Sequence, residues 1–322
     1  MISGSQSGLQ FPGSVEGFER NIVDFFARIG YSHTNESWRW MNRGCPFGDT
    51  VISFGVSDNR VVAHFAVLPV SIDVGGRIVV AGLGIHLGVD MDFRSVEHFI
   101  ALTNNLYKKC EARGMEVIFG FPNDNSWLPL TRLSGWKPGR DIVAFELDTA
   151  ESRGVRDPGL EIVPVTLFDD PMAALVSAFV PPKCVSIRKT SSYLSWRYVA
   201  KPAHSYFFIR NRAPRTSNGY LVAKSFQKDG KKHGQILEWG GDYENAAMFR
   251  ELVYGACRYF ASEGASVMSC WLTEDHPQVV QLKSFGFTQR AFATHFGFRL
   301  LGNSLKDLPD RWFLAMGDSD AY

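Results

Sequence analysis

Residues 81–126 read AGLGIHLGVDMDFRSVEHFIALTNNLYKKCEARGMEVIFGFPNDNS, and the order of elements within them indicates the fold class. Residues 82–89 are typical of a strand, and residues 95–113 have the spacing of a long helix that ends at a glycine. Residues 116–121 then read as a buried strand and residues 125–134 as a short helix. A strand, a long helix, a second strand and a short helix predict an α/β unit.

The residues on either side of this stretch complete one unit. Apolar side chains recur at helical spacing over residues 15–29, before Gly30. Residues 51–56, 61–70 and 72–80 are rich in β-formers, and Gly75-Gly76 marks a tight turn within the third segment. Residues 141–147 close the first half as a strand. We therefore expect a mixed, mainly antiparallel twisted sheet that is flanked by helices.

The second half of the chain repeats this order. Expected helices lie at 192–199, 246–262 and 277–284, and expected strands at 206–210, 220–226, 235–239, 266–272 and 291–300. Three local matches, in the same order, support a duplication: SWRW at 37–40 with SWRY at 195–198, Gly114 with Gly264, and LSGW at 133–136 with SFGF at 284–287. We predict two tandem α/β domains, residues 1–150 and 161–322, joined by a linker at 151–160.

Composition excludes several classes of protein. The 34 basic and 33 acidic side chains among 322 residues leave a net charge of +1, which gives no long-range field to attract nucleic acid or an anionic membrane. The five cysteines form no CxxC pair, which argues against a disulfide framework and a zinc site. No signal peptide is evident, and no apolar run approaches the roughly 20 residues of a membrane span. We expect a cytoplasmic protein that binds no metal, and the oligomeric state stays open.

The order of elements resembles the GNAT (GCN5-related N-acetyltransferase) fold. Several strings are similar to those of tandem GNAT proteins that are encoded beside polysaccharide-assembly enzymes. These are SWRW at 37–40, PFG at 46–48, Phe93-Arg94, GFPNDNS at 120–126, YLSWRY at 193–198 and MGDSD at 316–320. The resemblance covers the chain from about Phe18 to its end. It implies an acyltransferase that uses acetyl-CoA or another acyl-CoA, and whose small-molecule acceptor is an amino sugar or a similar polar metabolite of surface-polysaccharide synthesis.

The resemblance also implies where the cofactor would lie. In the family, two neighbouring strands separate and free backbone amides for the pantetheine arm, and a glycine loop at the start of the long helix holds the diphosphate. This places the cofactor contacts at Val89, Phe93, Arg94, Ser95 and Asn125. Asn125 has a second interpretation, because Asp124 or Asn125 would also cap the helix that follows.

The chain departs from the family pattern at the diphosphate loop. Aligned on Arg94, Glu97 replaces the first glycine and Phe99 replaces the last small residue. A carboxylate at Glu97 would repel a diphosphate. The tyrosine that many members use as a general acid is replaced by Thr131 in the first copy and by Leu282 in the second.

Four other residues are candidates for chemistry on the acceptor. His86 is a candidate general base, because a free imidazole has a pKa near neutrality, and its alternative is a buried structural histidine. Asp90 is a second catalytic candidate. Asp92 is expected on the same strand face as Asp90, where it would bind substrate, and both also fit a solvated strand end. Glu238 holds the comparable place in the second copy.

Two alternative functions remain open. The first is a catalytically degenerate GNAT-fold protein that serves as a binding or scaffold protein, which Glu97, Phe99 and Thr131 favour. The second is a transferase of the related tandem fold that takes amino acids from aminoacyl-tRNA. The near-neutral net charge opposes this second alternative, because tRNA binding needs a basic surface.

Overall fold

The computed structural model describes residues 8–140, 142–152, 160–211, 219–290, 293–302, 304–305 and 308–320. The chain forms two compact units. The first comprises Met1–Ser71, Val79–Gly139 and Phe296–Asp307, and the second comprises Ile72–Ile78, Arg140–His295 and Leu308–Tyr322.

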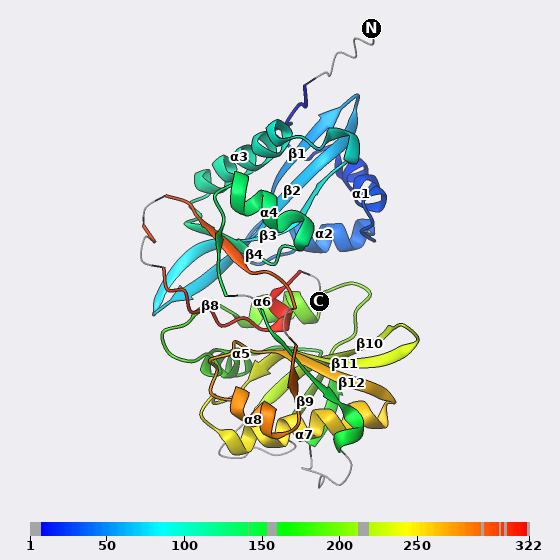
Figure 1. The fold of residues 1–322 in the computed structure, drawn as a ribbon, viewed down its shortest axis with the longest axis vertical. Coiled ribbons are helices and arrows are strands. Elements are labelled where there is room, and N and C mark those ends of the chain that lie inside the picture. Colours follow the sequence, from blue (N-terminus) through cyan, green and yellow to red (C-terminus); the bar gives the residue numbers. More distant parts are fainter. Residues whose placement is uncertain are drawn as a thin grey trace. The chain divides into compact units, whose positions relative to one another are not determined.

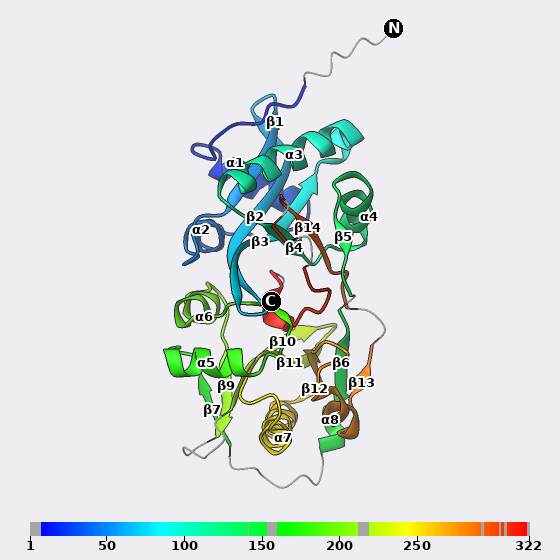
Figure 2. The same cartoon turned by 90° about the vertical axis from the view of Figure 1, so that its left-hand side faces the viewer.

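The first unit is a mixed sheet with two helices on each face. Its elements are α1 (Glu19–Arg28), α2 (Asn35–Arg43), β1 (Val51–Ser57), β2 (Arg60–Val74), β3 (Arg77–Val89), η1 (Met91–Phe93), α3 (Val96–Ala112), β4 (Val117–Gly120), α4 (Asp124–Leu133), β5 (Lys137–Pro138) and β14 (Gly297–Leu300). The strand order is β1-β2-β3-β4-β14-β5, and β3 and β4 are the parallel pair. Helices α1 and α2 cover one face, and α3 and α4 cover the other (Figures 1 and 2).

The second unit repeats the series. Its elements are β6 (Ala144–Asp148), η2 (Thr149–Ser152), β7 (Leu160–Pro164), α5 (Asp170–Ala178), β8 (Val185–Ile187), α6 (Ser191–Tyr198), β9 (Phe207–Asn211), β10 (Tyr220–Lys228), β11 (Lys231–Gly240), α7 (Ala246–Ser262), β12 (Ala265–Trp271), α8 (Val279–Ser284), β13 (Thr288–Gln289) and η3 (Met316–Asp318). The sheet order is β13-β6-β12-β11-β10-β9-β7, and β8 pairs separately with residues 72–74.

Each unit receives one strand from the other half of the chain. Strand β14 follows all other strands in sequence, yet it lies between β4 and β5, with Phe298 opposite Phe119. Strand β6 precedes the second copy, yet it lies between β12 and β13. Figure 2 shows the red β14 beside strands coloured blue to green. The compact units therefore differ from the sequential division at residues 150 and 161.

Most expected elements are present, and the short strands β5, β7, β8 and β13 are additions to them. Helices α2 and α5 were not expected from the sequence, and β2 is one continuous strand rather than two. The strand expected at 291–300 begins at Gly297. Within the expected linker at 151–160, residues 153–159 lie outside the described residues, and Leu160 already belongs to β7.

One long helix packs on the sheet of each unit and contributes to its hydrophobic core. In α3 the buried side chains Phe99, Leu102, Leu106 and Cys110 recur every three or four residues and face the sheet. The same pattern in α7 buries an apolar stripe against the second sheet. None of the described helices is long and apolar enough to cross a membrane.

Candidate functional site

The candidate site of the first unit lies where β3 and β4 separate. These parallel strands are in register from Ala81 opposite Val117 to Gly84 opposite Gly120. Strand β4 ends there, but β3 continues to Val89. The backbone of residues 85–89 therefore extends beyond the last residue of β4 on that side. An extended ligand with amide groups can pair with such a backbone edge.

Two glycines form the last residue pair before the separation. A Cβ atom at Gly84 would lie 3.2 Å from the ring of Trp136, and one at Gly120 would lie 3.3 Å from the same ring. The indole nitrogen of Trp136 donates to the Tyr107 hydroxyl at 2.9 Å, which holds the ring in place. The absence of side chains at these two glycines thus lets the Trp136 ring approach the point where the strands diverge.

His86 lies two residues beyond this last pair, in an unusual backbone conformation. Its φ angle is +53°, a left-handed conformation that residues other than glycine seldom adopt. Strain of this kind persists only where surrounding packing enforces it, and it is concentrated at functional sites. The His86 side chain is buried, as the structural alternative for this residue requires.

His86 belongs to a cluster of three histidines that we call the histidine cluster: His33, His64 and His86. The ring centroids of His33 and His86 are 4.5 Å apart, and those of His64 and His86 are 6.5 Å apart. Phe26 of α1 contacts all three rings at centroid distances of 4.8 to 5.0 Å. His33 is half-buried, so the cluster reaches from the core to the surface.

The hydrogen bonds of the cluster determine which nitrogens can accept a proton. Nδ1 of His64 lies 2.9 Å from the backbone oxygen of His86, so Nδ1 carries the hydrogen and Nε2 is the basic nitrogen. Burial lowers the pKa of His64 to about 4. Burial, together with the charges of His33 and His64, also holds the pKa of His86 well below its usual value. Both imidazoles are therefore neutral near pH 7.

The cluster does not have the arrangement of a metal centre. Among the described residues, no group of three or more His, Cys, Asp or Glu side chains could hold a metal ion. The cluster instead presents neutral imidazole nitrogens, which can take up a proton from a bound group.

The end of β3 and its connection to α3 contain four of the residues expected to contact a cofactor: Val89, Phe93, Arg94 and Ser95. The Nε atom of Arg94 donates to the backbone oxygen of Val89 at 3.1 Å, which closes the loop. Ser95 is the N-cap of α3 and accepts a hydrogen bond from the His98 amide at 3.1 Å. These bonds order the loop without help from the missing glycines.

Glu97 competes for the place that a diphosphate would take. It lies in the first turn of α3, where exposed N–H groups and the helix dipole favour an anion. Hydrogen bonds from its own backbone N–H and from the Ser95 hydroxyl lower the pKa of Glu97. The ionised carboxylate of Glu97 thus occupies this helix terminus itself.

The two aspartates at the end of β3 differ from expectation. The strand ends at Val89, so Asp90 and Asp92 do not share a strand face, because Asp92 lies in η1. The Asp90 carboxylate forms ion pairs with Arg60 at 2.9 Å and Arg28 at 3.3 Å. These contacts tie the strand end to α1 and β2, which is a structural role.

Helix α4 begins one residue earlier than expected, and its cap is another residue. Asn123 accepts from the Ser126 amide at 3.1 Å, so neither Asp124 nor Asn125 is the cap. Asn125 is exposed in the first turn. Thr131, at the position of the family tyrosine, donates to the backbone oxygen of Trp127 within its own helix, at 3.0 Å.

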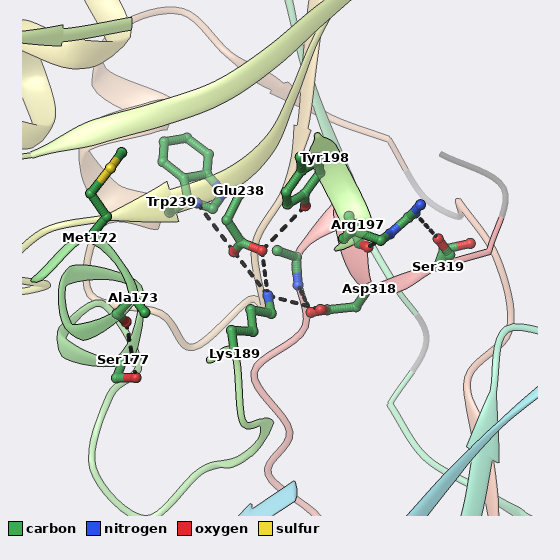
Figure 3. A network of polar contacts seen from close by, with 12 residues as sticks. Met172, Ala173, Ser177, Lys189, Arg197, Tyr198, Glu238, Trp239, Asp318 and Ser319 are labelled. Carbon is green, nitrogen blue, oxygen red and sulfur yellow. Dashed lines mark hydrogen bonds and ion pairs between the residues drawn. The ribbon is translucent and has the colours of Figure 1, made fainter. Parts of the chain in front are cut away.

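The corresponding place in the second unit contains a buried charge network. Strands β11 and β12 are in register up to Ile236 opposite Cys270, so Glu238 lies two residues past the last pair, as His86 does in the first unit. Lys189 lies 2.7 Å from Glu238 and 2.8 Å from Asp318, and all three are almost fully buried (Figure 3). Glu238 therefore corresponds to His86 rather than to Asp90.

The C-terminal segment packs against the end of β11 in the second unit. Arg197 donates to the backbone oxygens of Gly317 at 3.0 Å and Ser319 at 2.7 Å, as Figure 3 shows for Ser319. A Cβ atom at Gly317 would lie 2.9 Å from the backbone oxygen of Leu237, the first residue after the last β11–β12 pair. The Arg197 of the repeated SWRY string thus anchors this segment, whereas Arg39 of the first copy is exposed.

Sequence reasoning missed two members of the histidine cluster. His64 interrupts a continuous apolar run, residues 61–70, and a lone histidine in such a run is a usable signal. His33 lies in the polar connection between α1 and α2, where nothing in the sequence distinguishes it. Lys189 was also missed, because its partners are distant in sequence.

Comparison with known proteins supports the fold. No protein-family profile and no curated protein matches the chain. Among solved structures it is similar to a GCN5-related N-acetyltransferase from Anabaena variabilis, with 13% identity, a TM-score of 0.69 and coverage of 94% of this chain and 75% of that chain. It is also similar to a probable N-acyltransferase from Enterococcus faecalis, with 9% identity, a TM-score of 0.66 and coverage of 91% and 73%.

A third similar structure is Eis1 from Mycobacterium abscessus, with 12% identity, a TM-score of 0.59 and coverage of 91% of this chain and 73% of that chain. At these identities the likeness concerns the fold alone. The expected mixed α/β GNAT fold is confirmed, with twisted sheets flanked by helices.

Proposed function

We propose that the first unit catalyses GNAT-type acyl transfer from a thioester donor to an amine or hydroxyl of a small polar acceptor. The observation that carries this proposal is the separation of β3 from β4 beside His86 in its left-handed conformation. The equivalent place in the second unit contains the buried ion network of Lys189 and Glu238, so the proposal assigns activity to the first unit.

The histidine cluster supplies the base in this proposal. The acceptor loses a proton as its nitrogen or oxygen bonds to the thioester carbonyl and the C–S bond breaks. A neutral imidazole within hydrogen-bond reach can take that proton, and the thiolate leaves as a free thiol once it is protonated. His86 is buried beside the β3 edge, and the half-buried His33 stands 4.5 Å away between centroids. The contact between the two rings extends the cluster from the β3 edge to the surface.

An aromatic side chain beside the cluster favours a ring-shaped polar acceptor. Tyr31 is 38% exposed, and its ring centroid lies 6.0 Å from that of His86 and 6.3 Å from that of His33. The exposed part of the Tyr31 ring would pack against the C–H face of a sugar, and the histidines would contact the polar groups of that sugar. This supports an amino sugar or a similar polar metabolite as the acceptor, consistent with a role in surface-polysaccharide synthesis.

The donor would be acetyl-CoA or another acyl-CoA, which supplies a thioester carbonyl when it is bound. The backbone edge of residues 85–89 fits the extended pantetheine arm, because its amide groups can pair with those of the arm. The first turn of α3 fits the diphosphate only when the Glu97 carboxylate leaves it. We therefore expect weak binding of CoA, with Glu97 as the obstacle.

The test is a titration of CoA, acetyl-CoA and longer acyl-CoAs against wild type, Glu97→Gly and Glu97→Gln, read by calorimetry and by thermal unfolding. A ligand that binds only the folded protein raises the unfolding temperature with concentration. We expect Glu97→Gly to bind CoA about tenfold more tightly than wild type, which corresponds to about 1.4 kcal/mol. Release of free thiol in the presence of glucosamine then reports transfer.

Glu111→Gln is the matched control, because Glu111 is an exposed acid at the other end of α3. It should bind CoA as wild type does. If neither wild type nor Glu97→Gly responds to any acyl-CoA, the acyl-CoA proposal fails.

The position of Glu97 favours a second candidate, a GNAT-fold binding protein without catalysis. This candidate predicts no thiol release by any of these variants, even where CoA binds. An aminoacyl-tRNA donor is the remaining alternative, and the near-neutral net charge of +1 continues to oppose it.

A further inference from the structure

A cavity of about 400 Å³ lies in the second unit, with walls from the end of α5, from β8 and from residues 73–76. This volume is within the range of small-molecule sites, and we call it the α5–β8 cavity. All of its wall residues belong to the second unit, whereas the proposed acyl-transfer site belongs to the first. The cavity is therefore a separate candidate site.

Three charged side chains in the cavity wall can be reached by a ligand. Lys183 and Arg188 are exposed, and Asp73 is half-buried. Lys189 also lines the wall, but it is buried, and its ammonium already lies against two buried carboxylates. The charges available to a ligand are thus two cations and one acid.

None of these three charges is matched within the part of the chain that the structure describes. Neither Lys183 nor Arg188 forms an ion pair or a side-chain hydrogen bond with a described residue. One carboxylate oxygen of Asp73 accepts from the Gly76 amide at 2.6 Å, which holds the turn, and Asp73 forms no ion pair with a described residue. Charges of both signs therefore face one cavity without neutralising one another.

The pairing of β2 with β8 separates these charges along the wall. Asp73 lies opposite Ser186, so Arg188, two residues further along, is its diagonal neighbour, at a spacing of about 7–8 Å. Lys183 lies beyond the other end of β8, with a left-handed φ angle of +62°. Strain of this kind is concentrated at functional sites. The wall thus offers a cation on each side of a carboxylate.

We infer that the α5–β8 cavity binds an amino acid that carries a second acidic group. Its α-carboxylate would bind Arg188, its ammonium would bind Asp73, and its second acidic group would bind Lys183. Val180 and Pro182 line the cavity with surface that remains accessible, and they would contact the methylene groups of the ligand. The charges of such a ligand complement those of the wall in sign and in number. Neither the fold nor the proposed acyl transfer requires this site.

The test is a calorimetric titration of the full chain with L-glutamate and two analogues that each lack one charge. Glutarate lacks the ammonium, and L-norvaline lacks the second carboxylate. We expect L-glutamate to bind about tenfold more tightly than either analogue. Binding of O-phosphoserine in place of L-glutamate would identify the second acidic group as a phosphate.

Two variants place the ligand in the cavity. Asp73→Asn keeps an acceptor for the Gly76 amide, so it should weaken L-glutamate about tenfold without weakening glutarate. Lys183→Gln should weaken L-glutamate about tenfold and leave L-norvaline unchanged. Lys283→Gln is the matched control, because it removes the charge of an exposed lysine on α8, outside the cavity wall, and it should change none of these affinities.

Thermal unfolding of each variant without ligand checks that the fold is kept. If L-glutamate and O-phosphoserine both fail to bind the wild-type protein, the inference is overturned. It is also overturned if Asp73→Asn and Lys183→Gln bind L-glutamate as wild type does, because the ligand then lies elsewhere. Equal binding of L-glutamate and glutarate by wild type would exclude the role of Asp73.

Discussion

The Nζ atom of Lys189 lies 2.7 Å from a carboxylate oxygen of Glu238, and neither side chain is more than 4% exposed. Asp318 provides a second carboxylate 2.8 Å from the same nitrogen. One buried ammonium thus faces two acids. Burial, and secondarily the charge of Asp318, raise the pKa of Glu238 to about 7, even though Lys189 acts in the opposite direction. The neighbouring carboxylates raise the pKa of Lys189 despite its burial, so the ammonium stays charged, and Glu238 titrates near neutrality.

This arrangement predicts unequal effects of two substitutions in the network. Lys189→Met leaves two buried carboxylates without their cation and should cost about 3–5 kcal/mol of unfolding free energy. Glu238→Gln keeps the ion pair of Lys189 with Asp318 and should cost about 1 kcal/mol or less at pH 7. Urea denaturation of both variants measures the difference. Equal losses would mean that the two acids share the lysine equally.

The raised pKa of Glu238 also predicts a dependence of stability on pH. Between pH 4.5, the ordinary pKa of a glutamate, and about 7, folded Glu238 holds a proton that the unfolded chain releases. The contribution of Glu238 to stability is thus complete below pH 4.5 and is lost as the pH rises to about 7. His64 and His276, whose pKa values burial lowers to about 4, act in the opposite direction from pH 4 to 6.5.

The comparison that isolates Glu238 is therefore wild type against Glu238→Gln. The unfolding free energy of wild type minus that of the variant should decrease from pH 4.5 to 7 and stay constant above. A difference that is flat with pH would show that Glu238 is ionised throughout.

The local elements could be predicted from the sequence, because they follow from periodicity. Helix α7 has the bounds expected for it, residues 246–262, and the glycines that end the long helices, Gly114 and Gly264, adopt φ angles of +72° and +76°. The exchange of β6 and β14 could not be predicted. The corresponding strands of the two copies have the same order in both sheets. An apolar strand such as β6 or β14 can therefore pair in either sheet, and its pattern of side chains does not say in which one.

The part of the candidate site that is contiguous in sequence could be predicted, and the part that forms by packing could not. The loop residues Phe93, Arg94 and Ser95 are contiguous in sequence, and His86 stands on the strand before them. His33 and His64 join His86 only through packing around Phe26. Glu238 occupies the position that corresponds to His86, but its chemistry differs because Lys189 and Asp318 surround it. These two residues come from distant segments, so the sequence did not place them beside Glu238.

Substitutions at His86 should separate backbone strain from chemistry. His86→Asn keeps a residue type that tolerates the left-handed conformation, so it should fold but lose transfer activity by about 10²-fold or more. His86→Val is β-branched and should destabilise the protein as well. Unfolding temperature and thiol release, measured together, distinguish the two effects. Full activity in His86→Asn would exclude His86 as the base.

The low pKa of His86 also bears on the pH dependence of transfer. Because its pKa lies well below 6.5, His86 stays unprotonated as the pH falls through 6.5. We expect kcat to show no loss attributable to this histidine between pH 8 and 6.5. A kcat that halves near pH 6.5 would point instead to a base with an ordinary histidine pKa.

The exchange of strands predicts that fragments cut at the sequential boundary do not fold. A fragment of residues 1–150 lacks β14, which pairs with both β4 and β5, and it carries β6 without β12 and β13. The inward side chain of Phe298 is also missing, which leaves Phe119 and its neighbours exposed to water.

By contrast, residues 1–139 joined through a flexible Gly/Ser linker to residues 296–307 restore every strand of the first unit. We expect a cooperative thermal transition and protected β4 amides in hydrogen exchange for the joined chain, and neither for residues 1–150. Cooperative unfolding of the 1–150 fragment would show that the first unit is stable without β14, and that the exchanged strand is an addition to a complete domain.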